Sequence, residues 1–249
     1  MGSVDSYFYL FEKNIGVVSL EEQKKIRNSR VAIIGLGGIG GVALEILART
    51  GIENFTICDG DRVEMSNFNR QFLATSDSLG KRKVDIAKER LRRINKNITV
   101  NSYGKVDEKN IKKILKRVDI VVDGLDNLVS RIIVARTCED LNIPYVFGSA
   151  DRAKGMSTVF VNRSRSKNKF YFEKLLHLPT VGKSIKECKE KLKFCKSCDY
   201  VLGIAPNVIG AFEALQTIRL ILGKKIIEAP YVLFFDAFRK NPFYIRRLV

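Results

Sequence analysis

A short apolar run that ends in a glycine-rich turn and continues as an amphipathic helix constrains the fold of this chain most strongly. Val31 to Ile34 forms the apolar run, and the turn follows as Gly35-Leu36-Gly37-Gly38-Ile39-Gly40. Apolar residues then recur at the spacing of one buried helix face: Ile39, Val42, Ala43, Ile46 and Leu47. Because glycine amides and a helix N-terminus together hold phosphate oxygens, this pattern predicts a nucleotide site of unspecified type.

A carboxylate follows the next predicted strand. That strand spans Phe55 to Cys58, and Asp59 comes directly after it, where its side chain can accept a hydrogen bond from a ribose hydroxyl. A dehydrogenase needs little more than this acidic residue. This chain instead continues with Asn67, Arg70 and Gln71, whose amide and cationic groups would meet the phosphates of a nucleotide.

Residues 59–71, which read DGDRVEMSNFNRQ, resemble the D-x-D-x-V-x-x-S-N-x-x-R-Q signature of the ThiF/MoeB/HesA family, the ubiquitin-activating-type adenylating enzymes. The G-x-x-K element at 80–83, the G-x-D-N element at 124–127 and the sequence GIAPNVIG at 203–210 extend the resemblance over nearly the whole chain. The resemblance implies an ATP-dependent adenylyltransferase. In that reaction the C-terminal carboxylate of a small ubiquitin-like or sulfur-carrier protein attacks the α-phosphorus of ATP, pyrophosphate leaves, and the acyl-adenylate passes to a thiol or sulfur acceptor.

The resemblance also implies a role for each matching residue. Asp59 would bind ribose, Asp126 would bind magnesium, and Arg70 and Lys83 would act on the phosphates. The residues expected to contact ATP are Gly35, Gly37, Gly38, Gly40, Asp59, Asp61, Asn67, Arg70, Gln71 and Lys83.

Position along the chain favours two of these residues independently. Asp126 follows the predicted buried strand Ile120 to Val122, at the edge where an open parallel sheet binds ligands, and its oxygens suit magnesium. Capping of the next helix is the alternative role for Asp126. Lys83 opens a predicted helix, where a lysine opposes the helix dipole unless it serves an anion; a solvated lysine is the alternative.

The order of predicted elements indicates an α/β fold with a doubly wound, mostly parallel, Rossmann-like sheet and added antiparallel C-terminal strands. Strands are predicted at 98–102, 120–122, 145–148, 231–236 and 243–248, and helices at 108–116, 128–141 and 206–222. We expect a single adenylation domain over residues 1–249, because no second domain is needed at this length.

Residues 1–29 are expected to form an N-terminal lead-in segment. Ser19-Leu20-Glu21-Glu22 reads as a capping box that opens a short helix ending at Asn28. In the family, a basic residue before such a helix reaches the ATP of the neighbouring subunit; Lys13 holds that position here. We therefore expect a homodimer in which Lys13 acts in trans, with the hydrophobic run 7–11 buried against the partner or folded back on its own sheet.

Residues 162–200 match the crossover loop of the family and carry no regular pattern. Cys198 is a candidate nucleophile, because the lysines around it would lower the pKa of its thiol. Many relatives of the family bind zinc through two C-x-x-C pairs. Residues 170–173, which read FYFE, stand where the first pair would fall, and no second pair occurs near residue 249. A substitute site would have to combine His177, Cys188, Cys195 and Cys198, of which only the last two show zinc-like spacing, so we expect no zinc. We expect Cys58 and Cys138 to be buried as small hydrophobic residues.

The net charge of +17 is unusual and gathers in the segments 81–93 and 181–198. Such charge attracts nucleic acid or an acidic partner, although solvated helix faces are the simpler explanation. The chain shows no signal peptide and no membrane span, and five cysteines without a secretory signal indicate reduced thiols, so we expect a cytoplasmic protein.

Two alternatives remain open at this stage. The first is adenylation of a carboxylate carried on tRNA, as in the relatives that dehydrate threonylcarbamoyl-adenosine, whose N-x-N-R-Q element resembles residues 67–71. The second is an NAD-dependent oxidoreductase, which the glycine turn and Asp59 alone would support. A protein that binds ATP without catalysis is also conceivable.

Overall fold

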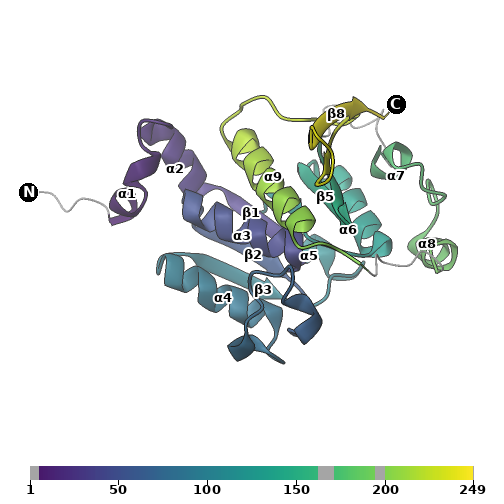
Figure 1. Ribbon diagram of the computed structural model, residues 1–249, viewed down its shortest axis with the longest axis horizontal. Helices are drawn as coiled ribbons and strands as arrows, with labels where there is room; N and C mark the ends of the chain where they lie inside the picture. Colours follow the sequence, from purple (N-terminus) through teal and green to yellow (C-terminus); the bar gives the residue numbers. More distant parts are fainter. Residues whose placement is uncertain (1–5, 162–170, 194–199, 249) are drawn as a thin grey trace, which may run out of the picture.

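The computed structural model describes residues 6–161, 171–193 and 200–248 (Figure 1). Its strands are β1 (Arg30–Ile34), β2 (Asn54–Cys58), β3 (Thr99–Tyr103), β4 (Ile120–Asp123), β5 (Tyr145–Asp151), β6 (Lys154–Phe160), β7 (Tyr231–Asp236) and β8 (Phe243–Arg247). In the described residues they form one sheet in the order β3-β2-β1-β4-β5-β6-β7-β8. The pairs from β3 to β5 are parallel, whereas β6, β7 and β8 pair antiparallel. The predicted fold class is therefore confirmed.

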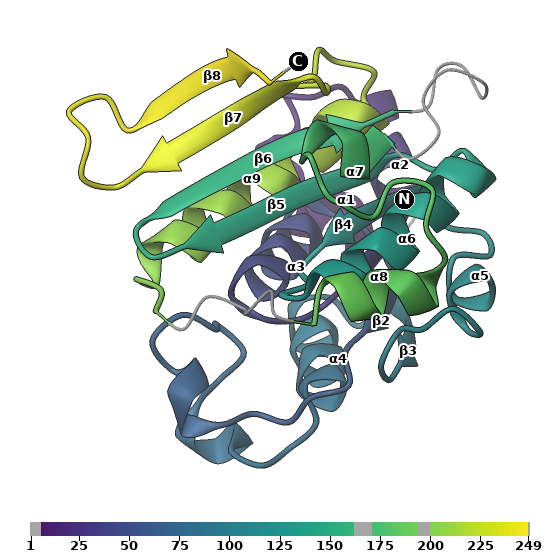
Figure 2. The same ribbon diagram turned by 90° about the vertical axis from the view of Figure 1, so that its right-hand side faces the viewer.

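Helices cover both faces of the sheet. The helices are α1 (Ser6–Leu10), α2 (Leu20–Asn28), α3 (Gly38–Thr50), α4 (Lys83–Ile94), α5 (Ile111–Ile114), α6 (Leu128–Leu141), α7 (Tyr171–Leu175), α8 (Ile185–Lys191) and α9 (Ile204–Ile221), and the 3-10 turns are η1 (Glu12–Asn14), η2 (Met65–Asn67) and η3 (Ser76–Ser78). Helices α3, α4 and α9 pack on one face, and α5 and α6 pack on the other, with α7 and α8 against α6 (Figure 2). None of the described helices is long and apolar enough to cross a bilayer.

The sheet separates two hydrophobic cores. Because successive side chains of a strand point to opposite faces, β1 supplies Ala32 and Ile34 to the core under α6, and Val31 and Ile33 to the core under α3. Burial on both faces explains why this parallel strand reads as an unbroken apolar run. The order of the strands reverses between β1 and β4, and this switch point opens a crevice at their carboxyl ends.

Three glycines let the backbone approach itself closely at this crevice. Gly35 has φ +95°, and a Cβ there would lie 2.4 Å from the carbonyl carbon of Gly124. A Cβ on Gly40 would lie 2.0 Å from the carbonyl oxygen of Gly35. The first turn of α3 therefore rests directly on the ends of β1 and β4, an approach that only glycine allows.

Some predicted boundaries are wrong. The helix predicted over 108–116 is only the single turn α5, and α9 begins at Ile204, which makes Pro206 its third residue rather than its first. The predicted capping box of α2 is confirmed, since Ser19 Oγ accepts from Glu22 N and Glu22 Oε2 accepts from Ser19 N.

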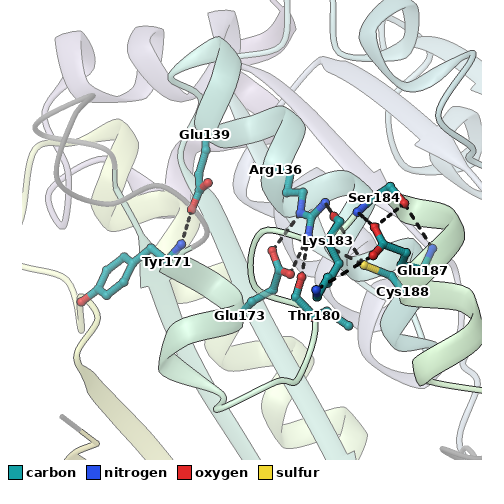
Figure 3. Close-up of polar contacts among 9 residues, drawn as sticks. All are labelled: Arg136, Glu139, Tyr171, Glu173, Thr180, Lys183, Ser184, Glu187 and Cys188. Atoms are coloured by element: carbon teal, nitrogen blue, oxygen red, sulfur yellow. Dashed lines mark hydrogen bonds and ion pairs between the residues drawn. The ribbon is translucent and has the colours of Figure 1, made fainter.

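The segment predicted as an irregular crossover loop contains two helices, α7 and α8, in its described part. One arginine of α6 fastens them (Figure 3). Arg136 donates from Nε and Nη2 to both carboxylate oxygens of Glu173 at 2.8 and 2.7 Å, from Nη1 to the carbonyl of Lys183 at 2.7 Å, and from Nη2 to the carbonyl of Thr180 at 3.1 Å. Because Glu173 is only 1% exposed, this buried ion pair sets the position of α7 and α8.

Candidate active site

A cavity of about 660 Å³ opens at the switch point between β1 and β4. It collects residues at the carboxyl ends of the five parallel strands β1 to β5 and in the first turns of α3, α4, α6 and α9, which is the position where open α/β sheets bind ligands. Nine predicted site residues line it: Gly35, Gly37, Gly38, Asp59, Asp61, Arg70, Gln71, Lys83 and Asp126. Segments far apart in the sequence thus converge on one cavity.

Asp59 lies at the end of β2 and is held by two backbone amides. Leu36 N donates to its Oδ2 at 2.7 Å and Asp61 N donates to its Oδ1 at 2.7 Å. Burial raises the pKa of the Asp59 carboxyl, and these amides and the charge of Lys83 oppose that effect. The hydrogen bond from Leu36 N joins the Asp59 carboxylate to the glycine turn, so the position of one is fixed relative to the other.

Lys83 is the first residue of α4 and is only 6% exposed. Its Nζ contacts Asp61 Oδ2 at 3.1 Å, and its backbone amide donates to the carbonyl of Asp61. A buried ammonium needs an anion, and Asp61 supplies one from the rim of the cavity. The solvated alternative is therefore wrong for Lys83.

Arg70 and Gln71 reach the cavity from the loop after η2. Arg70 Nη1 donates to the carbonyl of Ser66 at 2.7 Å and to Asn69 Oδ1 at 2.9 Å. Gln71 is 7% exposed and lies close to Gly37, where its amide nitrogen would be 3.9 Å from an added Cβ. The loop therefore presents a cation and an amide beside the glycine turn.

Asp126 lies on the rim after β4 and is exposed. The N-cap of α6 is Asn127, whose Oδ1 accepts from Ser130 N at 2.8 Å, so the alternative role of Asp126 as the helix cap is excluded. Across the described ranges, no three His, Cys, Asp or Glu side chains gather as metal ligands. One exposed carboxylate on the rim of this cavity nevertheless suits Mg²⁺, which takes one or two carboxylates and completes its shell with water and phosphate oxygens.

The remaining predicted residues lie apart from the cavity lining. Gly40 packs against the backbone of Gly35 and Gly124 and does not line the cavity. Asn67 is buried and closes its own turn, since its Oδ1 accepts from Glu64 N at 3.1 Å. Lys13 is 94% exposed and pairs with Glu12 at 3.1 Å. Cys198 lies outside the described residues, as does Cys195, so the nucleophile and the expected absence of zinc remain predictions.

Sequence reasoning missed a buried cluster beneath the rim. Asp123 is fully buried; its Oδ2 accepts from Tyr145 Oη at 2.7 Å and pairs with Arg131 Nε at 3.2 Å. Burial raises the pKa of Asp123, and the charge of Arg131 opposes this. Arg131 Nη2 donates to the carbonyls of Leu125 and Gly148, which joins the Asp126 loop to β5.

Other residues that were not predicted as site residues also line the cavity, from α6, from the end of β5 and from two connections: Lys105, Val106, Ser130, Ser149, Ala150, Asp151 and Val201. One signal pointed toward Arg131, which is a charged residue in an otherwise apolar stretch of α6. Cys58 and Cys138 are buried, as predicted, and burial raises the pKa of Cys58 to about 12. Neither thiol is available as a thiolate at neutral pH.

Comparisons with known proteins agree with the fold and the motif. The ThiF family matches residues 11–248. The probable molybdopterin-synthase adenylyltransferase of Gracilaria tenuistipitata var. liui is 32% identical over 215 residues, which are 86% of this chain and 57% of that protein. The molybdopterin-synthase adenylyltransferase of Haemophilus influenzae is 31% identical over 227 residues, which are 90% of this chain and 87% of that protein. This chain therefore spans little more than half of the first relative and most of the second.

A solved structure shares the fold. The crystal structure of E. coli MccB with AMPCPP and MccA matches this chain with a TM-score of 0.75 at 24% identity. The match covers 91% of this chain and 66% of that chain.

Proposed function

Because the chain belongs to the ThiF family, we propose that it is an ATP-dependent adenylyltransferase that activates the C-terminal carboxylate of a small ubiquitin-like or sulfur-carrier protein. The names of the Gracilaria and Haemophilus relatives, molybdopterin-synthase adenylyltransferases, support this activity. The observation that carries the proposal is the single cavity that brings the glycine turn together with Asp59, Arg70, Lys83 and Asp126.

Catalysis in this proposal rests on alignment and charge neutralisation. Asp59 accepts from the ribose, and the amides of the glycine turn admit the phosphates. Arg70 and Lys83 neutralise the pyrophosphate as it leaves, and Lys83 exchanges Asp61 for a phosphate oxygen. Asp126 would hold Mg²⁺, which would neutralise charge on the phosphates.

Pyrophosphate exchange into ATP tests the proposal. We expect exchange that depends on a carrier protein with a free C-terminal glycine and that vanishes when this carboxylate is blocked. If bulk tRNA stimulates exchange and the carrier protein does not, the activated substrate is a carboxylate carried on tRNA. Stabilisation by NAD without stabilisation by ATP in thermal-shift titrations would refute the proposed activity.

Two substitutions test the phosphate contacts. Arg70→Ala and Lys83→Ala should each lower exchange by roughly tenfold to a thousandfold, because each removes a charge that stabilises the leaving group. Arg92→Ala is the matched control, since Arg92 lies on α4 with Lys83 but is exposed and outside the cavity. Equal rates in all three variants would remove both residues from the site.

We further propose a homodimer that forms through the N-terminal segment. Tyr7 and Phe11 are buried within their own chain, at 0% and 7% exposure, so part of the hydrophobic run folds back. Tyr9 and Leu10 stay 74% and 53% exposed and are available to a second subunit. Lys13, in the same segment, would then reach the partner's ATP.

Subunit mixing tests this arrangement. Lys13→Ala and Arg70→Ala chains should each be impaired alone, and some activity should return on mixing, because both lesions can fall in one site and leave the other intact. A mixture that stays inactive despite confirmed subunit exchange would exclude the trans contact. Light scattering that shows an active monomer would exclude the dimer.

A further inference from the structure

The two basic segments of the sequence differ in the structure. In the first, which includes α4, acidic neighbours pair with three of the cations. Lys83 pairs with Asp61, Arg90 with Glu45 and Arg93 with Glu89. Carboxylates of the same chain therefore neutralise part of the positive charge of this segment.

The second basic segment joins another group of lysines on the opposite side of the sheet. Helices α5 and α8 both pack against α6 (Figure 2). Lys189 Nζ of α8 lies 3.9 Å from Glu108 Oε2, just before α5, so the two helices present one continuous surface. We call the exposed residues within 107–117 and 183–193 the α5–α8 surface.

This surface carries ten cationic side chains and four carboxylates, a net charge of +6. All ten cationic residues are exposed: Lys109, Lys112, Lys113, Lys116, Arg117, Lys183, Lys186, Lys189, Lys191 and Lys193. Two contacts with carboxylates on it are long, at 3.9 Å for Lys189 with Glu108 and 4.0 Å for Lys183 with Glu187. No ion pair is recorded for Lys112, Lys113, Lys116 or Lys186 within the described ranges.

Buried side chains and a hydrogen bond anchor the backbone under these lysines. Ile111 and Ile114 of α5 are buried, as is Leu115 directly after it. Cys188 of α8 is also buried, as is Leu192 directly after that helix. Arg136 also fixes the start of α8 through the carbonyl of Lys183 (Figure 3). The charges are therefore displayed on anchored elements, which limits the entropy lost when a partner binds.

We propose that the α5–α8 surface binds the phosphate backbone of a nucleic acid. An acidic protein fits the surface less well, because protein interfaces use apolar anchors and arginine and are poor in lysine. No large hydrophobic side chain is exposed within 107–117 or 183–193, and nine of the ten cations are lysines. Phosphate contacts by lysine need neither an anchor nor a bidentate fork.

The absence of aromatic residues from both ranges further defines the ligand. Single-stranded nucleic acid is bound through bases that stack on aromatic side chains. Without aromatic residues, the surface can recognise only the charge and shape of the phosphate backbone. It should therefore prefer a duplex to a single strand and show little sequence preference. The proposal does not depend on adenylation, since none of the ten cationic residues lines the cavity.

Fluorescence anisotropy with a labelled 24-base-pair RNA of arbitrary sequence, titrated at several KCl concentrations, tests the proposal. The test variant is Lys112→Gln/Lys113→Gln/Lys116→Gln/Lys186→Gln. The control is Lys25→Gln/Lys96→Gln/Lys225→Gln/Lys240→Gln, which removes the same charge from exposed positions elsewhere. All eight side chains are exposed. Thermal melts verify that both variants are folded. If a quadruple variant unfolds at a lower temperature than the wild type, variants with two of its four substitutions are used instead.

The wild-type protein should bind the duplex with an affinity that falls as salt rises, by about 0.9 logarithmic units per contact and per tenfold salt. The test variant should lose at least tenfold in affinity and up to about 3.6 units of this slope, at about 0.9 units for each of its four lysines, while the control keeps its slope. Equal losses in both variants, or no binding of the wild type at 0.15 M KCl, would overturn the proposal. Displacement of the RNA by an equal charge concentration of polyglutamate would instead assign the surface to an acidic protein.

Discussion

Replacement of Arg136 by methionine should loosen the α7–α8 segment more than the rest of the molecule. The guanidinium donates to both oxygens of Glu173 and to the carbonyls of Thr180 and Lys183. Methionine keeps most of the volume but removes every one of these bonds. A carboxylate that is only 1% exposed would then lose its charged partner.

The expected cost is large because the charge that remains is buried. Removal of one partner of a buried ion pair costs about 3–5 kcal/mol. If residues 171–193 open as a unit, this corresponds to faster amide exchange there by roughly a hundredfold to several thousandfold. Hydrogen exchange of peptides from this segment, compared with peptides from β1, measures the effect directly.

Arg30→Met is the matched control. Arg30 also makes a two-nitrogen contact with a carboxylate, that of Asp119, but the two side chains are 50% and 39% exposed. An exposed pair contributes below about 1 kcal/mol. The double variant Arg136→Met/Glu173→Leu should recover most of the loss, because no unpaired charge is then buried. Exchange in 171–193 that rises no more for Arg136→Met than for Arg30→Met would refute the reasoning.

Two further predictions concern the cavity. Gly35→Ala should lower stability and ATP binding, because its Cβ would lie 2.4 Å from Gly124; Gly80→Ala, also at positive φ but with open space around it, should cost only the backbone strain, and equal melting temperatures would contradict the clash. Asp126→Asn should raise the magnesium concentration needed for half-maximal exchange, whereas Ser184→Ala, which removes the N-cap of α8 outside the cavity, should cost about 1 kcal/mol of stability with no change in that concentration. An unchanged magnesium dependence in Asp126→Asn would remove it as a ligand.

Local patterns predicted the parts of the site that are themselves local. The glycine turn, Asp59 and the start of α4 are each specified by a few consecutive residues, and each lies where the sequence placed it. Asn67 shows the limit of spacing. Its position in the S-N-x-x-R-Q part of the signature predicts a contact with ATP, but in the structure its side-chain oxygen accepts a hydrogen bond from Glu64 N and closes its own turn. Spacing gives proximity in the chain and does not give the direction of a side chain.

The contacts that the sequence could not predict join distant segments. Arg136 meets Glu173 across 37 residues, and these partners become neighbours only when the chain returns over α6. Arg131 likewise bonds to the backbone at Gly148 on β5. Charged residues on apolar helix faces signal that such partners exist, but only the tertiary fold identifies them.

Glu213 offers a test of whether a buried carboxyl stays protonated. It lies on α9 against Gly148 of β5, it is fully buried, and neither of its oxygens has a hydrogen-bond partner among the described residues. Burial raises its pKa well above the usual value, the charge of Asp123 raises it further, and that of Arg131 opposes both. The folded state therefore holds a proton that the unfolded chain releases above about pH 4.3.

The sign of the pH dependence follows from this difference. Stability that comes from the protonated carboxyl is present below the unfolded pKa and is lost as pH rises toward the folded pKa, by up to about 1.4 kcal/mol per pH unit. Glu213→Gln keeps the shape and cannot ionise, so its advantage over the wild type in urea unfolding should grow between about pH 4.5 and pH 8. Gln216→Met, one turn further along α9 and equally buried, changes a neutral group and should shift stability by a constant amount. Parallel pH profiles of the wild type and Glu213→Gln would mean that Glu213 does not hold the proton.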